Sequence, residues 1–204
     1  MKESKTLLQR EHNRSDQASM MRGNTAFALS LYAQLYSQEG NLFFSPLSLS
    51  LALAMTYAGA RGQTAEQIAT VLHCVADQHS LHSAFAALST DLHADRNTPG
   101  YQLRMANALW GQKGYGFCEN FLRTIKTQYG AGLHEVDFQS AVEAARQLIN
   151  AWVQEQTQDK IKNLISPSAL NALTHLVLVN AIYFHGEWLS PFMKLLTKEE
   201  NFTV

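Results

Sequence analysis

Hydrophobic positions divide the chain into helical and extended segments. After a polar start, Phe27, Leu31 and Leu35 recur at four-residue spacing, which predicts an amphipathic helix whose N-cap is Asn24. Similar patterns predict further helices at 64–72, 81–92, 119–129 and 145–153, and strands at 41–44, 101–110 and 133–138. Helices therefore dominate the first half of the chain and strands become more frequent later, which predicts a mixed α+β fold.

The segment 45–62 needs a choice between strand and helix. Leucines alternate with small residues over 47–55, which taken alone indicates a strand. However, Ser45 is a good N-cap, Pro46 suits the first helical position, and Gly59 supplies a stop. We therefore predict a helix with apolar groups on every side, as in a central buried helix. Thr64 should begin the next helix with a capping box.

The most apolar segment of the chain lies near its C-terminus. Every residue from Leu176 to Phe184 is apolar except Asn180. A short continuous run with β-branched and aromatic residues predicts a strand that is buried on both faces inside a wide sheet. The chain offers few strands to flank it, so we expect the sequence to form part of a larger domain.

Composition excludes several classes of function. The 204 residues are 46% hydrophobic and 16% charged with a net charge of −1, so neither global disorder nor binding to nucleic acid or an anionic membrane is expected. The longest apolar run is too short to cross a bilayer. The two cysteines, Cys74 and Cys118, are expected to be free thiols. Residues 1–21 lack an apolar secretory region and are expected to form a flexible tail, which favours the cytosol unless a leader or another export route exists.

Candidate chemistry is sparse. The sequence holds no phosphate-binding loop and no G-x-S-x-G motif, so we expect neither an enzyme nor a cofactor. Ser45 is better explained as a helix cap than as a nucleophile, and Asn180 as a structural hydrogen-bonding residue. One group could supply metal ligands, but its irregular spacing favours a solvated connection between helices: His73, Cys74, Asp77, His79 and His82.

Three segments together resemble the serpin family. The first is NLFFSPLSLSLALAMTYAGARGQTAEQIATVL, at 41–72. The second is Asn150 to Val153 followed by Thr157 and KIKNLI, and the third is LVLVNAIYFHGEW followed by Pro191-Phe192 and TKEENF. The resemblance runs from about residue 22 to the last residue. His185 and Glu187 depart from the basic residues usual in the family, at positions expected to lie on the surface.

The resemblance implies a particular domain organisation. After the tail at 1–21, residues 22–204 would form the N-terminal portion of a serpin domain. The implied fold is α+β, with a helical cluster packed on a large, mainly antiparallel sheet. The C-terminal strands of that fold and its reactive loop would lie beyond this chain.

The resemblance also implies a function. Serpins inhibit serine proteases as suicide substrates: the cleaved reactive loop inserts into the main sheet and carries the acylated protease with it. Ser45, Ser48 and Asn180 match polar residues that form a structural lock under the sheet, and Trp188 matches the site of loop entry. The partner would be a serine protease, and the whole protein would be an extracellular monomer. The present chain alone would be inactive and prone to self-association.

Two other functions compete with inhibition. A serpin-fold protein could act as a chaperone or carrier, which the hinge before the reactive site would reveal. An unrelated α+β enzyme would need a pocket of titrating residues, which the sequence does not show. A heparin-type cofactor is not expected, because the predicted helix at 81–92 has no Lys or Arg before Arg96.

Overall fold

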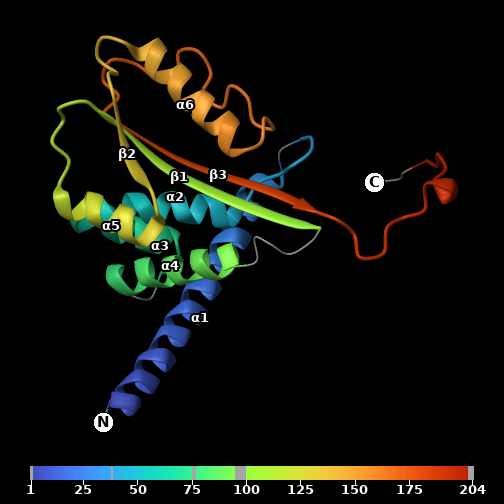
Figure 1. Cartoon of the computed structure of the whole chain (residues 1–204), viewed down its shortest axis with the longest axis horizontal. Coiled ribbons are helices and arrows are strands. Elements are labelled where there is room, and N and C mark those ends of the chain that lie inside the picture. The colour runs from blue at the N-terminus through green and yellow to red at the C-terminus, as the bar shows by residue number, and fades with distance from the viewer. Residues whose placement is uncertain (1, 38, 75–76, 95–99, 202–204) are drawn as a thin grey trace.

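A computed structural model describes residues 2–37, 39–74, 77–94 and 100–201. It shows an α+β fold in which helices pack on both faces of a mixed sheet, and this confirms the predicted fold class (Figure 1). The elements in chain order are α1 Lys2–Leu35, α2 Pro46–Gly59, α3 Gly62–Val71, α4 Gln78–Ala94, β1 Tyr101–Gln112, α5 Glu119–Tyr129, β2 Gly132–Val136, α6 Val142–Gln156, β3 Leu176–Gly186 and a 3₁₀ turn at Lys194–Leu196.

The sheet has the strand order β2-β1-β3. β1 pairs with β2 in parallel and with β3 in antiparallel register, so that Asn107 lies directly opposite Asn180. β3 is therefore an edge strand in the described part of the chain, although the sequence predicts a strand buried on both faces. Only Val179 and Ala181 of β3 are fully buried, and Phe184 is 64% exposed. The long apolar run forms the predicted strand, but no strand in the described part of the chain pairs with its outer edge.

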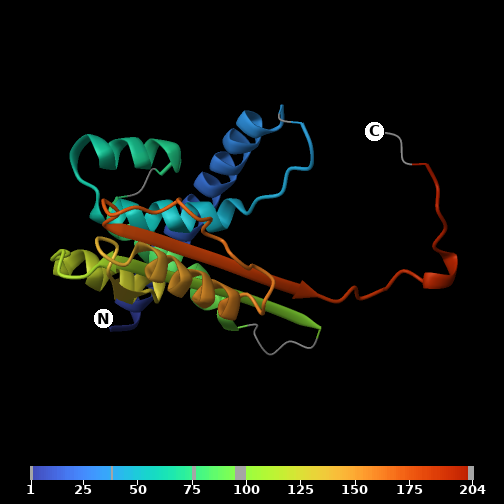
Figure 2. The same cartoon turned by 90° about the horizontal axis from the view of Figure 1, so that it is seen from above.

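Two hydrophobic cores lie on opposite faces of the sheet. Figures 1 and 2 show α6 on one face, where Ile149 and Val153 pack with Phe138 of the β2–α6 connection. The opposite face carries α2, α4 and α5, and its core includes Met55 and Ile125. The alternation of side chains along β1 and β3 therefore feeds two different cores.

Helix α2 is the central helix of the second core, as predicted. Its N-cap Ser45 accepts a hydrogen bond from the backbone N–H of Ser48 at 3.3 Å, and Pro46 is the first helical residue. Ala54 and Met55 have no exposed surface. The helix therefore forms in spite of the alternating leucines. The first backbone N–H groups of a helix have no partner within it, and the Ser45 side chain accepts a hydrogen bond from one of them.

Three predicted details are wrong. The first helix starts at Lys2 and not after Asn24, because 2–23 contains no proline and no glycine before Gly23 and the helix continues through it. The next helix starts at Gly62 with Arg61 as N-cap, so Thr64 lies inside it and caps nothing. Residues 41–44 form no strand.

The ends of the chain project from the body. Figure 1 shows the first half of α1 pointing away from the sheet, and the segment after β3 also runs away from it. The backbone of 2–21 is helical, while the flexibility expected of residues 1–21 stays a prediction. Among the described residues, no helix combines the length and hydropathy that a membrane span needs. Neither Cys74 nor Cys118 forms a disulfide, as predicted.

Candidate functional site: a polar lock between α2 and the sheet

Asn180 joins the two long strands to the helix beneath them. Its amide nitrogen donates a hydrogen bond of 2.6 Å to the side-chain oxygen of Asn107 on β1, and its side-chain oxygen accepts one from the hydroxyl of Ser48 on α2. The amide nitrogen of Asn107 donates at 3.2 Å to the backbone carbonyl of Tyr129, the last residue of α5. We call this continuous chain of hydrogen bonds, from Ser48 through Asn180 and Asn107 to the Tyr129 carbonyl, the polar lock.

The lock occupies an otherwise apolar row. Leu178 and Ile182 flank Asn180 on the same side of β3, and both pack against the core of α2. Asn180 is half-buried in this row, and its two amide donors and its acceptor oxygen need partners. Leaving one of these groups buried without a partner costs about 1–3 kcal/mol, so the lock stabilises one particular placement of β3 on α2.

The predicted site residues are only partly brought together. Ser48 and Asn180 contact each other directly. Ser45 has no hydrogen bond to Asn180 among those described; it caps α2 and contacts the backbone of Ser48. Asn107 was missed from the sequence, because only the register of β1 against β3 reveals that two asparagines face each other.

Trp188 lies outside the lock. It follows the end of β3, is 73% exposed, and makes an edge-on contact with Phe192, with ring centroids 5.9 Å apart. Nothing described in the structure joins it to Asn180 or to α2. Its role in loop entry therefore stays a prediction.

The side chain of Tyr129 forms a buried polar pair with His82. Its hydroxyl and the Nδ1 atom of His82 on α4 share a hydrogen bond of 2.6 Å, and both side chains are about 5% exposed. Burial lowers the pKa of His82 to about 4 and raises the pKa of the Tyr129 phenol. This corrects one expectation: His82 is a core residue, whereas His73 and His79 are exposed as expected of a solvated connection.

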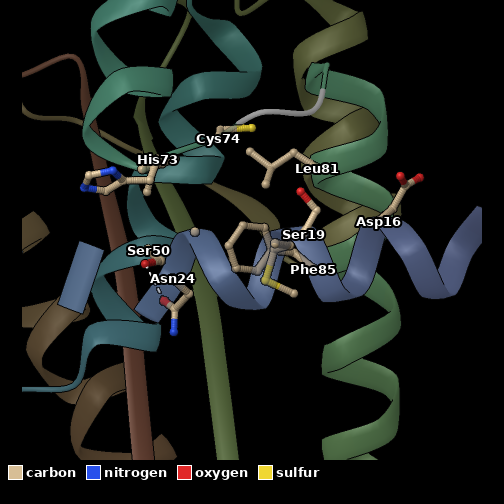
Figure 3. A pocket seen from close by; sticks show the side chains of 11 residues that line it. Asp16, Ser19, Asn24, Ser50, His73, Cys74, Leu81 and Phe85 are labelled. Atoms are coloured by element: carbon tan, nitrogen blue, oxygen red, sulfur yellow. Dashed lines mark hydrogen bonds between the residues drawn. The ribbon is translucent and has the colours of Figure 1, made fainter. Parts of the chain in front are cut away.

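Other cavities carry less chemistry. A cavity of about 370 Å³ lies beside the lock and is lined by both Asn107 and Tyr129 as well as by His134 and Trp152. Figure 3 shows a smaller one of about 10 Å³ between α1, α2 and α4, where the hydroxyl of Ser50 donates to the side-chain oxygen of Asn24 at 2.7 Å. That volume suits about one water molecule. Among the described residues, no group of three or more His, Cys, Asp or Glu side chains is placed to hold a metal ion.

Comparison with known proteins identifies the family. The family model described as Serpin (serine protease inhibitor) matches residues 22–204. The chain belongs to the serpin family. This is a family of protease inhibitors and not of enzymes.

The relatives are considerably longer than this chain. It is 46% identical over 180 residues to a leukocyte elastase inhibitor of Xenopus tropicalis and 45% identical over 181 residues to one of Bos taurus. These matches cover 87% and 88% of this chain and 47% of each relative. The structure of emu ovalbumin superposes with a TM-score of 0.84 at 31% identity, covering 90% of this chain and 51% of that one. The chain thus spans about half the length of the relatives it matches, and the structure is a partial serpin fold.

Proposed function

We propose that this chain supplies the first half of a serpin that inhibits serine proteases by the suicide-substrate mechanism. The names of the relatives point to an elastase-like protease as the target. The relatives do not support the extracellular location implied by the family resemblance.

The observation that carries the proposal is the polar lock. In this mechanism the main sheet must stay closed until the protease cleaves the loop, and must then part beside the strand that corresponds to β3. Hydrogen bonds from Ser48 through Asn180 to Asn107 connect α2 to both long strands at the middle of their length. Each bond contributes about 1 kcal/mol net, which is enough to bias a metastable sheet without fixing it permanently.

The chain is expected to be inactive alone. The family resemblance places the reactive loop and the strand that pairs with the outer edge of β3 outside residues 1–204. That edge is unpaired in the described structure. The protease partner therefore needs a part of the serpin fold that this polypeptide does not supply.

A chimera tests the proposal directly. Residues 1–204 would be joined to the C-terminal half of the Xenopus tropicalis leukocyte elastase inhibitor and mixed with elastase. We expect a complex that survives boiling in SDS, as for the parent inhibitor. A folded chimera that elastase cleaves as an ordinary substrate would contradict an inhibitory role and favour the chaperone or carrier alternative.

A further inference from the structure

Tyr129 forms hydrogen bonds through both its backbone carbonyl and its side-chain hydroxyl. It is the last residue of α5, and Gly130 follows it with a left-handed backbone (φ 63°) that ends the helix. Its carbonyl is one of the last four of the helix, which have no donor within the helix itself. The side chain of Asn107 supplies that donor, so the end of α5 is fastened to β1 through the polar lock.

The side chain of Tyr129 is held on the opposite side. Its hydroxyl bonds His82 of α4 at 2.6 Å, and its ring meets the His82 ring edge-on with centroids 5.7 Å apart. Phe85, one turn further along α4, packs against the same ring at 6.3 Å. The phenol therefore fixes the last turn of α5 against α4 as well as filling the core.

We propose that Tyr129 is a positioning residue that ties α4 to the polar lock. The inference rests on the lock proposed above. Without the hydroxyl, the ring loses its polar anchor on α4, and the last turn of α5 gains freedom to shift. The Tyr129 carbonyl moves with that turn, so the bond from Asn107 weakens and Asn107 holds Asn180 less firmly. The effect passes from α4 to the last turn of α5 through the hydrogen bond between His82 and Tyr129, and from the Tyr129 carbonyl along the hydrogen bonds of the polar lock to β1, β3 and α2.

Amide hydrogen exchange on the 204-residue chain, at a concentration where it is monomeric, tests this coupling. Tyr129→Phe removes the hydroxyl and keeps the ring and the carbonyl. Ile125→Val is the matched control, because Ile125 lies on the same helix in the same core, is 1% exposed, and has no side-chain hydrogen bond to lose. Asn107→Ala breaks the lock itself and serves as the positive reference.

For Tyr129→Phe we expect the amides of β1 and β3 around Asn107 and Asn180 to exchange about five- to tenfold faster, the factor that corresponds to the net contribution of one hydrogen bond. Ile125→Val loses only core packing, so it should accelerate these amides no more than the other amides of the same core. In the double variant His82→Gln/Tyr129→Phe the acceleration should equal that of Tyr129→Phe alone, because both changes break the same link.

The outcomes separate the two claims. If Asn107→Ala accelerates these amides but Tyr129→Phe does so no more than Ile125→Val, the coupling through Tyr129 is wrong and the lock stands. If Asn107→Ala leaves them unchanged as well, the lock is wrong and the coupling fails with it. Acceleration around Asn107 and Asn180 by both Asn107→Ala and Tyr129→Phe, beyond that caused by Ile125→Val, supports the inference.

Discussion

Acid should destabilise the chain through His82. Burial of its ring holds the pKa in the folded state at about 4, compared with 6.5 in an ordinary environment. Between these two values the unfolded chain binds a proton that the folded chain does not. Stability from this residue is therefore fully present above pH 6.5 and is lost as the pH falls from 6.5 to about 4. At about 1.4 kcal/mol for each pH unit, the loss reaches up to about 3 kcal/mol.

Urea unfolding at a series of pH values measures this effect. Carboxylates also titrate near pH 4, the lower end of this range. The wild-type chain must therefore be compared with the variant His82→Gln, because a glutamine side chain does not take up a proton. We expect the unfolding free energy of the wild type to fall by up to about 3 kcal/mol more than that of the variant between pH 6.5 and 4. Parallel curves for the two proteins would refute the conclusion that His82 is held neutral in the core.

Three further predictions concern assembly and inhibition. Residues 1–204 mixed with elastase-, trypsin- or chymotrypsin-like proteases should give no complex on SDS gels, and the appearance of one would show that the missing loop is not needed. The purified chain should self-associate through the open edge of β3, so light scattering after size exclusion should give a mass above 22.8 kDa; a monomer that binds no hydrophobic dye would show that this edge is covered. In the chimera, Asn180→Leu should cost about 1–3 kcal/mol by breaking the lock, and Ser45→Ala about 0.5–2 kcal/mol by removing the cap of α2; both should speed polymerisation on mild heating, while the exposed control Gln139→Ala should not. Rates on native gels equal to those of the control would show that neither residue helps to hold the sheet closed.

Local signals allowed much of the fold to be predicted from the sequence. The limits of α5 follow from its pattern and from Gly130, and α2 is recognised from Ser45 and Pro46 although its leucines alternate. These features act within a few residues, so a single sequence carries them. The predicted strands at 101–110 and from Leu176 onward form as expected, each extending two residues further.

Nonlocal contacts could not be predicted in the same way. Asparagine is a residue type favoured at helix N-caps, but the side chain of Asn24 instead accepts a hydrogen bond from Ser50 on α2, 26 residues away. Asn107 belongs to the lock only because β1 and β3 pair in one register, and His82 is buried only because α5 places Tyr129 against it. The serpin resemblance supplied Ser48 and Asn180, and it grouped Ser45 with them although its role in the structure is to cap α2.

A double-mutant cycle between Ser48→Ala and Asn180→Ala tests the polar lock most directly. The unfolding free energies of the wild-type chain, both single variants and the double variant would be measured in urea at a concentration where the chain is monomeric. The account predicts a coupling energy of about 1 kcal/mol, because either alanine alone breaks the hydrogen bond between α2 and β3. Ser48→Ala combined with Gln139→Ala should be additive. A coupling energy indistinguishable from that control pair would contradict the lock.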